Sequence, residues 1–283
     1  MKYRRFLPAT AFVMLATAAA AFGATPINTA PYTITTPGSY QLTANLNVTG
    51  NTVAVRISAP NVTLDLSGYS ITCTQCGSGS GIVATGSGTL IENGSVTGFD
   101  NGTPEMPGAG IFFYAYAEGR VSHMSVQNNS SGVLARSGVN LVVEDSTFIL
   151  NGVGINCGEC ILLTVVNSRI MEGFNQGIEM GAGFITQSQI ANNLNYAIEV
   201  YPTSTTTNTL TLVQITNSLV QASTLVPAIH QVAGSLLTIG SSTISGSVTI
   251  DGAPNVVWMS SGGACLVNST GNIGPCPVQY QTQ

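Results

Sequence analysis

A three-residue phrase recurs along this chain: Gly or Ala, then an aliphatic residue, then a position that varies. It is found at Gly81-Ile82-Val83, Gly110-Ile111-Phe112, Gly132-Val133-Leu134, Gly154-Ile155-Asn156, Gly177-Ile178-Glu179, Ala197-Ile198-Glu199 and Ala228-Ile229-His230. The intervals between the aliphatic residues are 29, 22, 22, 23, 20 and 31 residues. A period of about 20 to 30 residues is typical of solenoids, in which each repeat stacks on the previous one. The pattern therefore predicts a repeat architecture.

A second set of positions follows the same period. Each phrase is followed downstream by a polar pair, a spacer and an apolar residue, in segments that begin at Asn93, His123, Asp145, Asn167, Gln187, Asn217 and Ser241. Two sets that stay in phase over seven repeats are unlikely to arise by chance. We expect the first polar residues to stack at a turn, where their side chains form hydrogen bonds from coil to coil.

Strands are the expected elements within each repeat. The repeats contain short apolar runs rich in Val, Ile and Thr, separated by Gly, Asn or Ser, which is typical of strands and turns. No sustained helical period is present. Insertions at 98–109 and 201–209 break the strict hexapeptide period that a left-handed β-helix requires. The prediction is an all-β, single-domain, right-handed parallel β-helix of about nine coils.

The N-terminal segment predicts an exported protein. Lys2, Arg4 and Arg5 precede an apolar run that ends in small residues, which is typical of a signal peptide. We divide the chain into a signal peptide at 1–24, an N-terminal cap at 25–52, the β-helix at 53–259 and a C-terminal cap or tail at 260–283. The expected location is secreted, periplasmic or extracellular.

Charge excludes one class of partner. Once the signal peptide is removed, no lysine remains, and four arginines face twelve acidic residues, a net charge of about −8. Such a surface repels phosphates and other polyanions. We therefore expect no nucleic-acid partner. No later stretch has the length and apolar character of a membrane span.

The six cysteines lie in three close pairs: Cys73 and Cys76, Cys157 and Cys160, Cys265 and Cys276. An even number in an exported chain favours three local disulfides. The alternative is a zinc site built from the two Cys-x-x-Cys pairs. These pairs lie three to four repeats apart, which is about 14–19 Å at a strand spacing of roughly 4.8 Å. The spacing therefore argues against zinc.

The opening of the β-helix carries a family resemblance. Pro37-Gly38-Ser39-Tyr40, followed by Asn61-Val62-Thr63-Leu64-Asp65-Leu66, resembles the start of many exported bacterial β-helix proteins of the pectate-lyase-like superfamily. The resemblance implies the fold over nearly the whole mature chain. It implies no single activity, because the superfamily includes lyases, hydrolases, epimerases, esterases and adhesins. The paired Asp, Gly-His-Gly and Arg-Ile-Lys motifs of its galacturonan hydrolases are not found in this sequence, and the lack of lysine disfavours an acidic-polysaccharide lyase.

Candidate chemistry lies at the third position of the repeated phrase. Alternation along a strand places this position opposite the inward aliphatic residue, toward solvent. In the C-terminal repeats it gathers Asn156, Glu179, Glu199 and His230. Adjacent coils would bring the two carboxyls within about 5 Å, so that one has a raised pKa. This pair is a candidate for acid-assisted cleavage of a glycosidic bond, with His230 as an orienting group or second base.

Other interpretations of this ladder stay open. The side chains could be ordinary hydrated surface, and Asn156 with the carboxylates could bind calcium; no other metal or cofactor is expected.

An aromatic patch and an acidic pair offer two weaker candidates. Phe112, Phe113, Tyr114 and Tyr116 could stack on sugar rings, or alternate members could pack in the core. Glu144 and Asp145 are expected to face opposite sides of a strand and so form a poor catalytic pair.

Taken together, the sequence predicts a protein that engages an extracellular polysaccharide or cell-surface glycan. Glycosidic cleavage is the first hypothesis. A non-enzymatic surface or matrix scaffold is the alternative.

Overall fold

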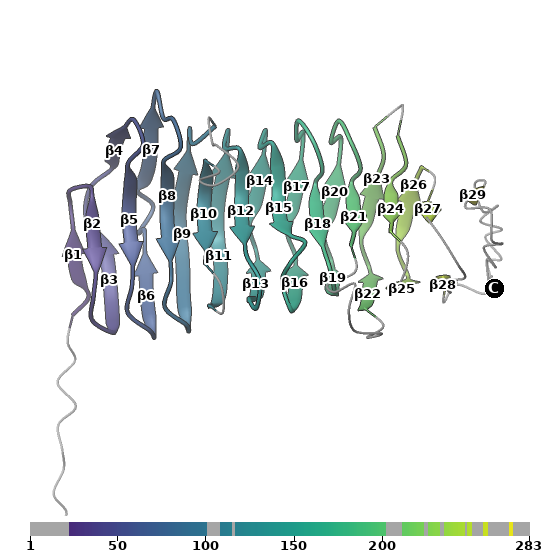
Figure 1. The fold of residues 1–283 in the computed structure, drawn as a ribbon, viewed down its shortest axis with the longest axis horizontal. Coiled ribbons are helices and arrows are strands. Elements are labelled where there is room, and N and C mark those ends of the chain that lie inside the picture. The colour runs from purple at the N-terminus through teal and green to yellow at the C-terminus, as the bar shows by residue number, and fades with distance from the viewer. Residues whose placement is uncertain are drawn as a thin grey trace, which may run out of the picture.

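The computed structural model describes residues 23–100, 108–114, 117–201, 211–223, 226–232, 235–246, 248–250, 257–259 and 272–273. Short strands follow one another through this part of the chain, and Figure 1 shows them stacked side by side from β1 (Thr25–Ile27) to β27 (Val248–Ile250). The described residues contain no helix that is long and apolar enough to cross a membrane.

One sheet holds the repeated phrase. Its strands are β2 (Tyr32–Ile34), β5 (Val53–Ile57), β8 (Ser80–Ala84), β10 (Ala109–Phe113), β12 (Ser131–Ala135), β15 (Val153–Cys157), β18 (Ile178–Met180), β21 (Ile198–Val200), β24 (Ile229–Gln231), β27 and β29 (Asn272–Ile273). Neighbours from β2 to β27 pair in parallel. The seven aliphatic residues of the phrase pair in register, and each is 0% exposed. The predicted inner column is confirmed.

A second, longer sheet forms the remaining faces. Its strands are β1, β3 (Gly38–Leu42), β4 (Leu46–Thr49), β6 (Val62–Asp65), β7 (Ser70–Thr74), β9 (Thr89–Thr97), β11 (Glu118–Gln127), β13 (Asn140–Glu144), β14 (Thr147–Ile149), β16 (Leu162–Val166), β17 (Arg169–Met171), β19 (Gly183–Thr186), β20 (Gln189–Ala191), β22 (Thr211–Thr216), β23 (Leu219–Gln221), β25 (Ser235–Gly240), β26 (Thr243–Ser245) and β28 (Val257–Met259). All of its strand pairs are parallel.

The long sheet bends along the predicted polar column. Asn93, His123, Asp145, Asn167, Gln187, Asn217 and Ser241 all have φ between 46° and 59°. Asn, Asp and His adopt this left-handed conformation more readily than most residues. The predicted turn is confirmed, and it divides the long sheet into two faces. Hydrogen bonds between the column's own side chains are fewer than expected; one runs from Asn167 Nδ2 to Asp145 Oδ1, at 2.6 Å.

The next residue after the bend makes the more regular ladder. Backbone N–H groups donate to serine Oγ atoms one coil onward at 3.1–3.2 Å, in the pairs Met124–Ser146, Ser146–Ser168, Ser168–Ser188, Ser188–Ser218 and Ser218–Ser242. Each of these hydroxyls donates in turn to the carbonyl two residues before it. The serines therefore satisfy buried backbone groups where the strand ladder is interrupted. This role of the serines was not predicted from the sequence.

The small first residue of the phrase has a steric cause. A Cβ atom at Gly132 would lie 2.5 Å from the carbonyl oxygen of Gly154, and one at Gly154 would lie 2.5 Å from that of Gly177. Backbone atoms at that distance cannot move aside to accommodate a Cβ atom. Close stacking of the coils at this strand position therefore favours Gly.

Eight coils follow one another from β5–β6–β7 to β24–β25–β26, and β2, β3 and β4 add a turn within the segment that we predicted as a cap. The all-β parallel β-helix predicted from the sequence is confirmed. Most of the predicted signal peptide and C-terminal tail lies outside the described residues.

Two of the three predicted disulfides are present. Cys73 bonds to Cys76 and Cys157 to Cys160, with Cα atoms 5.7 and 5.1 Å apart. The zinc alternative is wrong, because these four sulfurs are consumed in separate local disulfides. Cys265 and Cys276 lie outside the described residues, so their disulfide stays a prediction.

Candidate functional site

Four consecutive strands bring the candidate polar residues together. Asn156 on β15 pairs with Glu179 on β18, which pairs with Glu199 on β21, which pairs with His230 on β24. Because neighbouring strands lie about 4.8 Å apart, each side chain has the next as its neighbour. The predicted ladder register is confirmed.

The ladder is less exposed than predicted. Val83 and Leu134 are buried, and Glu199 is only 5% exposed, while Asn156 and Glu179 are half-buried. The expectation that this position faces open solvent is therefore wrong for several repeats. At Glu199 the cause is visible, because side chains from neighbouring loops and coils surround the carboxylate.

Three side chains hydrogen-bond to the Glu199 carboxylate. Gln176 Nε2 donates to Oε2 at 2.5 Å, and His230 Nδ1 lies 3.0 Å from Oε1. The Tyr201 hydroxyl supplies a third hydrogen bond. Burying a charged carboxylate is unfavourable unless such partners replace water. This set of partners explains how Glu199 is accommodated beneath the surface.

Two of the surrounding side chains come from one repeated loop position. Gln176 immediately precedes Gly177, and Tyr196 immediately precedes Ala197, so both end the loop that leads into a strand of the ladder. Gln176 contacts Glu199, one coil onward, and the Tyr196 ring lies over the His230 ring, with centroids 4.5 Å apart. Neither residue was predicted from the sequence. Their shared place before the repeated phrase was the available signal.

Glu179 differs from Glu199 in both exposure and proton affinity. Burial first, and then the charge of Glu199, raise the pKa of Glu179 from 4.5 to about 7. A carboxylate in a low-dielectric site next to a second carboxylate holds its proton more tightly. Glu179 is therefore partly protonated at neutral pH.

A cavity of about 350 Å³ opens beside Glu179. Its walls are Ala135, Arg136, Asn156, Gly158, Glu159, Glu179 and Tyr201. It thus contains one guanidinium, two carboxyls, an amide and a phenol. Glu199 and His230 do not line it, so the structure brings Asn156 and Glu179 to the cavity and leaves the other two on the next strands, outside its lining.

Tyr201 links the cavity to the buried carboxylate. It lies two residues after Glu199, so alternation places both side chains on the outer side of the coil. Its ring reaches back toward Gly158, where a Cβ atom would lie 3.7 Å from Cδ2. Burial, the hydrogen bond to Glu199 and the nearby carboxylates raise the pKa of Tyr201 above its usual range. Tyr201 was not predicted as a site residue, although its spacing of two residues from Glu199 was the available signal.

The aromatic patch is split between core and surface. Phe113 is 0% exposed, whereas Tyr114 is 55% exposed and meets Phe112 edge to face, with centroids 5.6 Å apart. Tyr116 lies outside the described residues. The suggested sugar contact at Tyr114 and Tyr116 stays a prediction.

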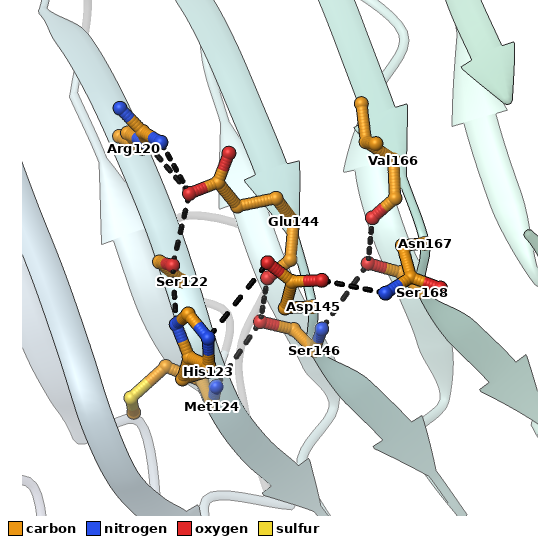
Figure 2. A network of polar contacts seen from close by, with 10 residues as sticks. All are labelled: Arg120, Ser122, His123, Met124, Glu144, Asp145, Ser146, Val166, Asn167 and Ser168. Atoms are coloured by element: carbon orange, nitrogen blue, oxygen red, sulfur yellow. Dashed lines mark hydrogen bonds and ion pairs between the residues drawn. The ribbon is translucent and has the colours of Figure 1, made fainter. Parts of the chain in front are cut away.

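A second polar cluster lies on the long sheet, and Figure 2 shows it. Glu144 Oε1 accepts hydrogen bonds from Arg120 and from Ser122 Oγ, the latter at 3.0 Å. Asp145 Oδ2 lies 3.8 Å from His123 Nε2, and Asp145 Oδ1 accepts a hydrogen bond from Asn167 Nδ2. The expectation that Glu144 and Asp145 face opposite sides is wrong, because the chain bends at Asp145, where φ is 48°. Both carboxylates belong to one surface network.

Metal binding finds no further support in this geometry. Among the described residues, no three or more His, Cys, Asp or Glu side chains gather as a metal-binding group. The calcium hypothesis for Asn156 and the two carboxylates stays a prediction.

These observations define a class: a parallel β-solenoid that carries two adjacent carboxyl groups, one buried and one lining a surface cavity. Residues 61–215, more than half of the chain, match the family described as "Right handed beta helix region". The chain belongs to this right-handed β-helix family. Searches of curated proteins and of solved structures found no match.

Proposed function

We propose that this protein is exported, engages a carbohydrate outside the cytoplasm and cleaves a glycosidic bond at the cavity beside Glu179. The observation that carries the proposal is a cavity-lining carboxyl with a pKa of about 7, next to a second carboxylate on the adjacent strand. Glycosidic cleavage uses a carboxyl that keeps its proton near neutral pH, together with a second carboxylate. Glu179 is the proton donor in this proposal.

The cavity supports a sugar as the ligand. Its volume of about 350 Å³ lies at the lower end of the range of about 300–1,000 Å³ that is typical of ligand sites. Tyr201 offers an aromatic ring, and Asn156 and Arg136 offer hydrogen-bond donors. An aromatic face combined with a few polar groups suits a sugar ring, which has apolar faces and a polar rim.

The disulfides support the proposed export. Disulfides persist in oxidising compartments, and the two described here close short loops within single coils. The basic and apolar N-terminal segment points the same way.

The first test is product release from neutral and acidic polysaccharides. The purified mature protein is compared with Glu179→Gln, with Glu179→Gln/Glu199→Gln and with the control Glu172→Gln. Glu172 is exposed at a neighbouring turn, so its variant removes one carboxylate and leaves the cavity intact. We expect turnover by the parent and the control, and a loss of about 100-fold or more in both Glu179 variants. Equal turnover in all four proteins would move the chemistry elsewhere; no turnover in any would reject the enzymatic proposal.

One observation favours the alternative of a non-enzymatic scaffold. Phe174 and Leu194 are 62% and 65% exposed, and they stand at equivalent places on two adjacent coils. Exposed apolar side chains at neighbouring positions are typical of partner-binding surfaces. Glycan binding without product release, lost in a Phe174→Ser/Leu194→Ser variant, would support this alternative.

A further inference from the structure

The two carboxyls of the ladder have unequal access to a ligand. Glu179 lines the cavity, whereas Glu199 is 5% exposed and does not line it. The three hydrogen bonds to Glu199 come from Gln176, His230 and Tyr201, and the first of these partners is itself buried. A sugar in the cavity would therefore meet Glu179 directly and Glu199 only through an intervening group.

Tyr201 is that group. Its side chain lines the cavity, and its hydroxyl hydrogen-bonds to Glu199. Its ring also extends toward Gly158, across the coil that carries Glu179. The Tyr201 phenol thus lies between the cavity and a proton acceptor, the Glu199 carboxylate. A nucleophile held against a general base has this arrangement.

We infer that Tyr201 is the nucleophile of the proposed glycosidic cleavage, and that Glu199 is a positioning residue that accepts its proton. The inference rests on the proposed function, since it assigns the second role at the same site. It corrects the simplest interpretation of the ladder, in which both Glu side chains contact the sugar.

The first step balances with three groups. Tyr201 Oη attacks the anomeric carbon, and its proton passes to Glu199. The glycosidic C–O bond breaks, and the leaving oxygen takes the proton of Glu179. The products are a glycosyl–Tyr201 bond, a protonated Glu199, an ionised Glu179 and the released alcohol.

The second step restores the site. A water molecule gives a proton to Glu179 as its oxygen attacks the anomeric carbon. The bond to Tyr201 breaks, and the phenolic oxygen takes back its proton from Glu199. The net reaction is hydrolysis with retention, because the anomeric carbon is attacked twice from alternate faces.

Local electrostatics fit a protonated phenol as the attacking group. A tyrosinate beside two carboxylates would concentrate negative charge, which is why the phenol keeps its proton at rest. During the attack, the proton moves to Glu199 and the total charge of the Tyr201–Glu199 pair is unchanged until the new bond forms. His230 Nδ1 remains on the other oxygen of Glu199 and holds that carboxylate in place.

The test is covalent trapping on the full mature chain. The probe is a panel of 2-deoxy-2-fluoro glycosides with dinitrophenyl leaving groups. The fluorine slows both steps and the dinitrophenyl group speeds the first one, so that a glycosyl adduct accumulates. After proteolysis, we expect the added mass on the peptide that contains Tyr201. An aryl glycoside resists hydroxylamine, whereas an ester on Glu199 or Glu179 is cleaved by it, so this treatment identifies the bonded atom.

Two variants complete the test. Tyr201→Phe should lose the adduct and at least about 100-fold in kcat/KM, while Tyr69→Phe, which removes a phenol from a distant turn, should match the parent. If Tyr201→Phe fails to fold by circular dichroism, the adduct on the parent protein decides alone. A hydroxylamine-sensitive adduct, or turnover without an adduct, would overturn the role of Tyr201 and leave the glycosidase proposal standing. Neither adduct nor turnover with any substrate would overturn both.

Discussion

Two clusters in this molecule have nearly the same ingredients and different behaviour. The cluster on the short sheet contains two Glu side chains, a His and a Tyr hydroxyl, and the cluster on the long sheet contains Glu144, Asp145, a His and a Ser hydroxyl. Figure 2 shows that the second cluster also includes Arg120, which hydrogen-bonds to Glu144. No Arg is bonded to the first pair among the described residues.

The difference lies in the surroundings of the carboxylates. Glu144 has a cation beside it, and the Arg120 side chain is 55% exposed to water. Glu179 has burial and a second carboxylate, and its pKa rises to about 7. Residue types alone therefore do not define a reactive site. Solvent access and the sign of the nearest charge decide which carboxyl keeps a proton.

The largest expected contrast between the clusters is in stability. Glu199→Ala leaves the buried Gln176 amide and the His230 imidazole without their acceptor, so we expect a loss of about 3 kcal/mol. Glu144→Ala leaves Arg120 to water, and Ser122 still lies 2.8 Å from His123 Nδ1, so we expect a loss of about 1 kcal/mol or less. Urea unfolding followed by circular dichroism measures both. Equal losses would mean that the two clusters contribute alike.

The next prediction concerns how the stability contribution of Glu179, in the short-sheet cluster, depends on pH. Because the pKa of Glu179 is raised from 4.5 to about 7, the folded state holds this proton more tightly than the unfolded chain. The contribution of the carboxyl to stability is therefore full below pH 4.5 and is lost as the pH rises through about 7. Glu179→Gln stays neutral, so its stability relative to the parent should increase by about 3 kcal/mol between pH 4 and pH 8, since each unit of pKa shift is worth about 1.4 kcal/mol. Thermal melts at each pH measure this.

Glu172→Gln is the control for the pH series, because that side chain is exposed. The gain of Glu179→Gln with pH is therefore measured relative to this variant. If the difference between the two variants stays constant across the range, Glu179 titrates as an ordinary carboxyl.

The repeat pattern predicted much of this arrangement. Ile178 and Ile198 fix the register, so the adjacency of Glu179 and Glu199 followed from counting residues between repeated phrases. A raised pKa of one carboxyl was expected from that adjacency, but burial is its larger cause. The register is set by backbone periodicity, which the sequence carries directly, whereas burial is not.

The burial of Glu199 and the side-chain contacts that cause it were not predictable from the repeat pattern. Glu199 is buried because the side chain of Gln176, from a loop, contacts it and the ring of Tyr201 extends toward Gly158. Both contacts depend on side-chain conformations. The relation of Glu144 to Asp145 was mispredicted, because one positive φ interrupts the strand alternation. Period-2 arguments hold only where the strand is regular.

A third prediction separates the two causes of the shift at Glu179. Glu199→Gln removes the neighbouring charge and keeps the volume and the burial. Since burial is the larger cause, the pKa of Glu179 should fall by about one unit or less and stay above 4.5. Carbon-13 NMR titration of Glu side-chain carboxyls measures it, with Arg120→Gln as a control that leaves Glu179 unchanged. A fall to 4.5 would make the Glu199 charge the main cause.

The smallest expected effect is at the exposed ion pair. Arg120→Gln removes the cation from Glu144, yet the Arg120 side chain is 55% exposed and the Glu144 side chain is 20% exposed, so water replaces much of the interaction. We expect a loss of less than about 1 kcal/mol at low salt, and a smaller one in 1 M sodium chloride, where charges are screened over about 3 Å. Urea unfolding at the two salt concentrations measures the difference. A loss of about 2 kcal/mol that salt does not reduce would place the long-sheet cluster in the same energetic class as Glu199, and the contrast between a solvated and a buried carboxylate would fail.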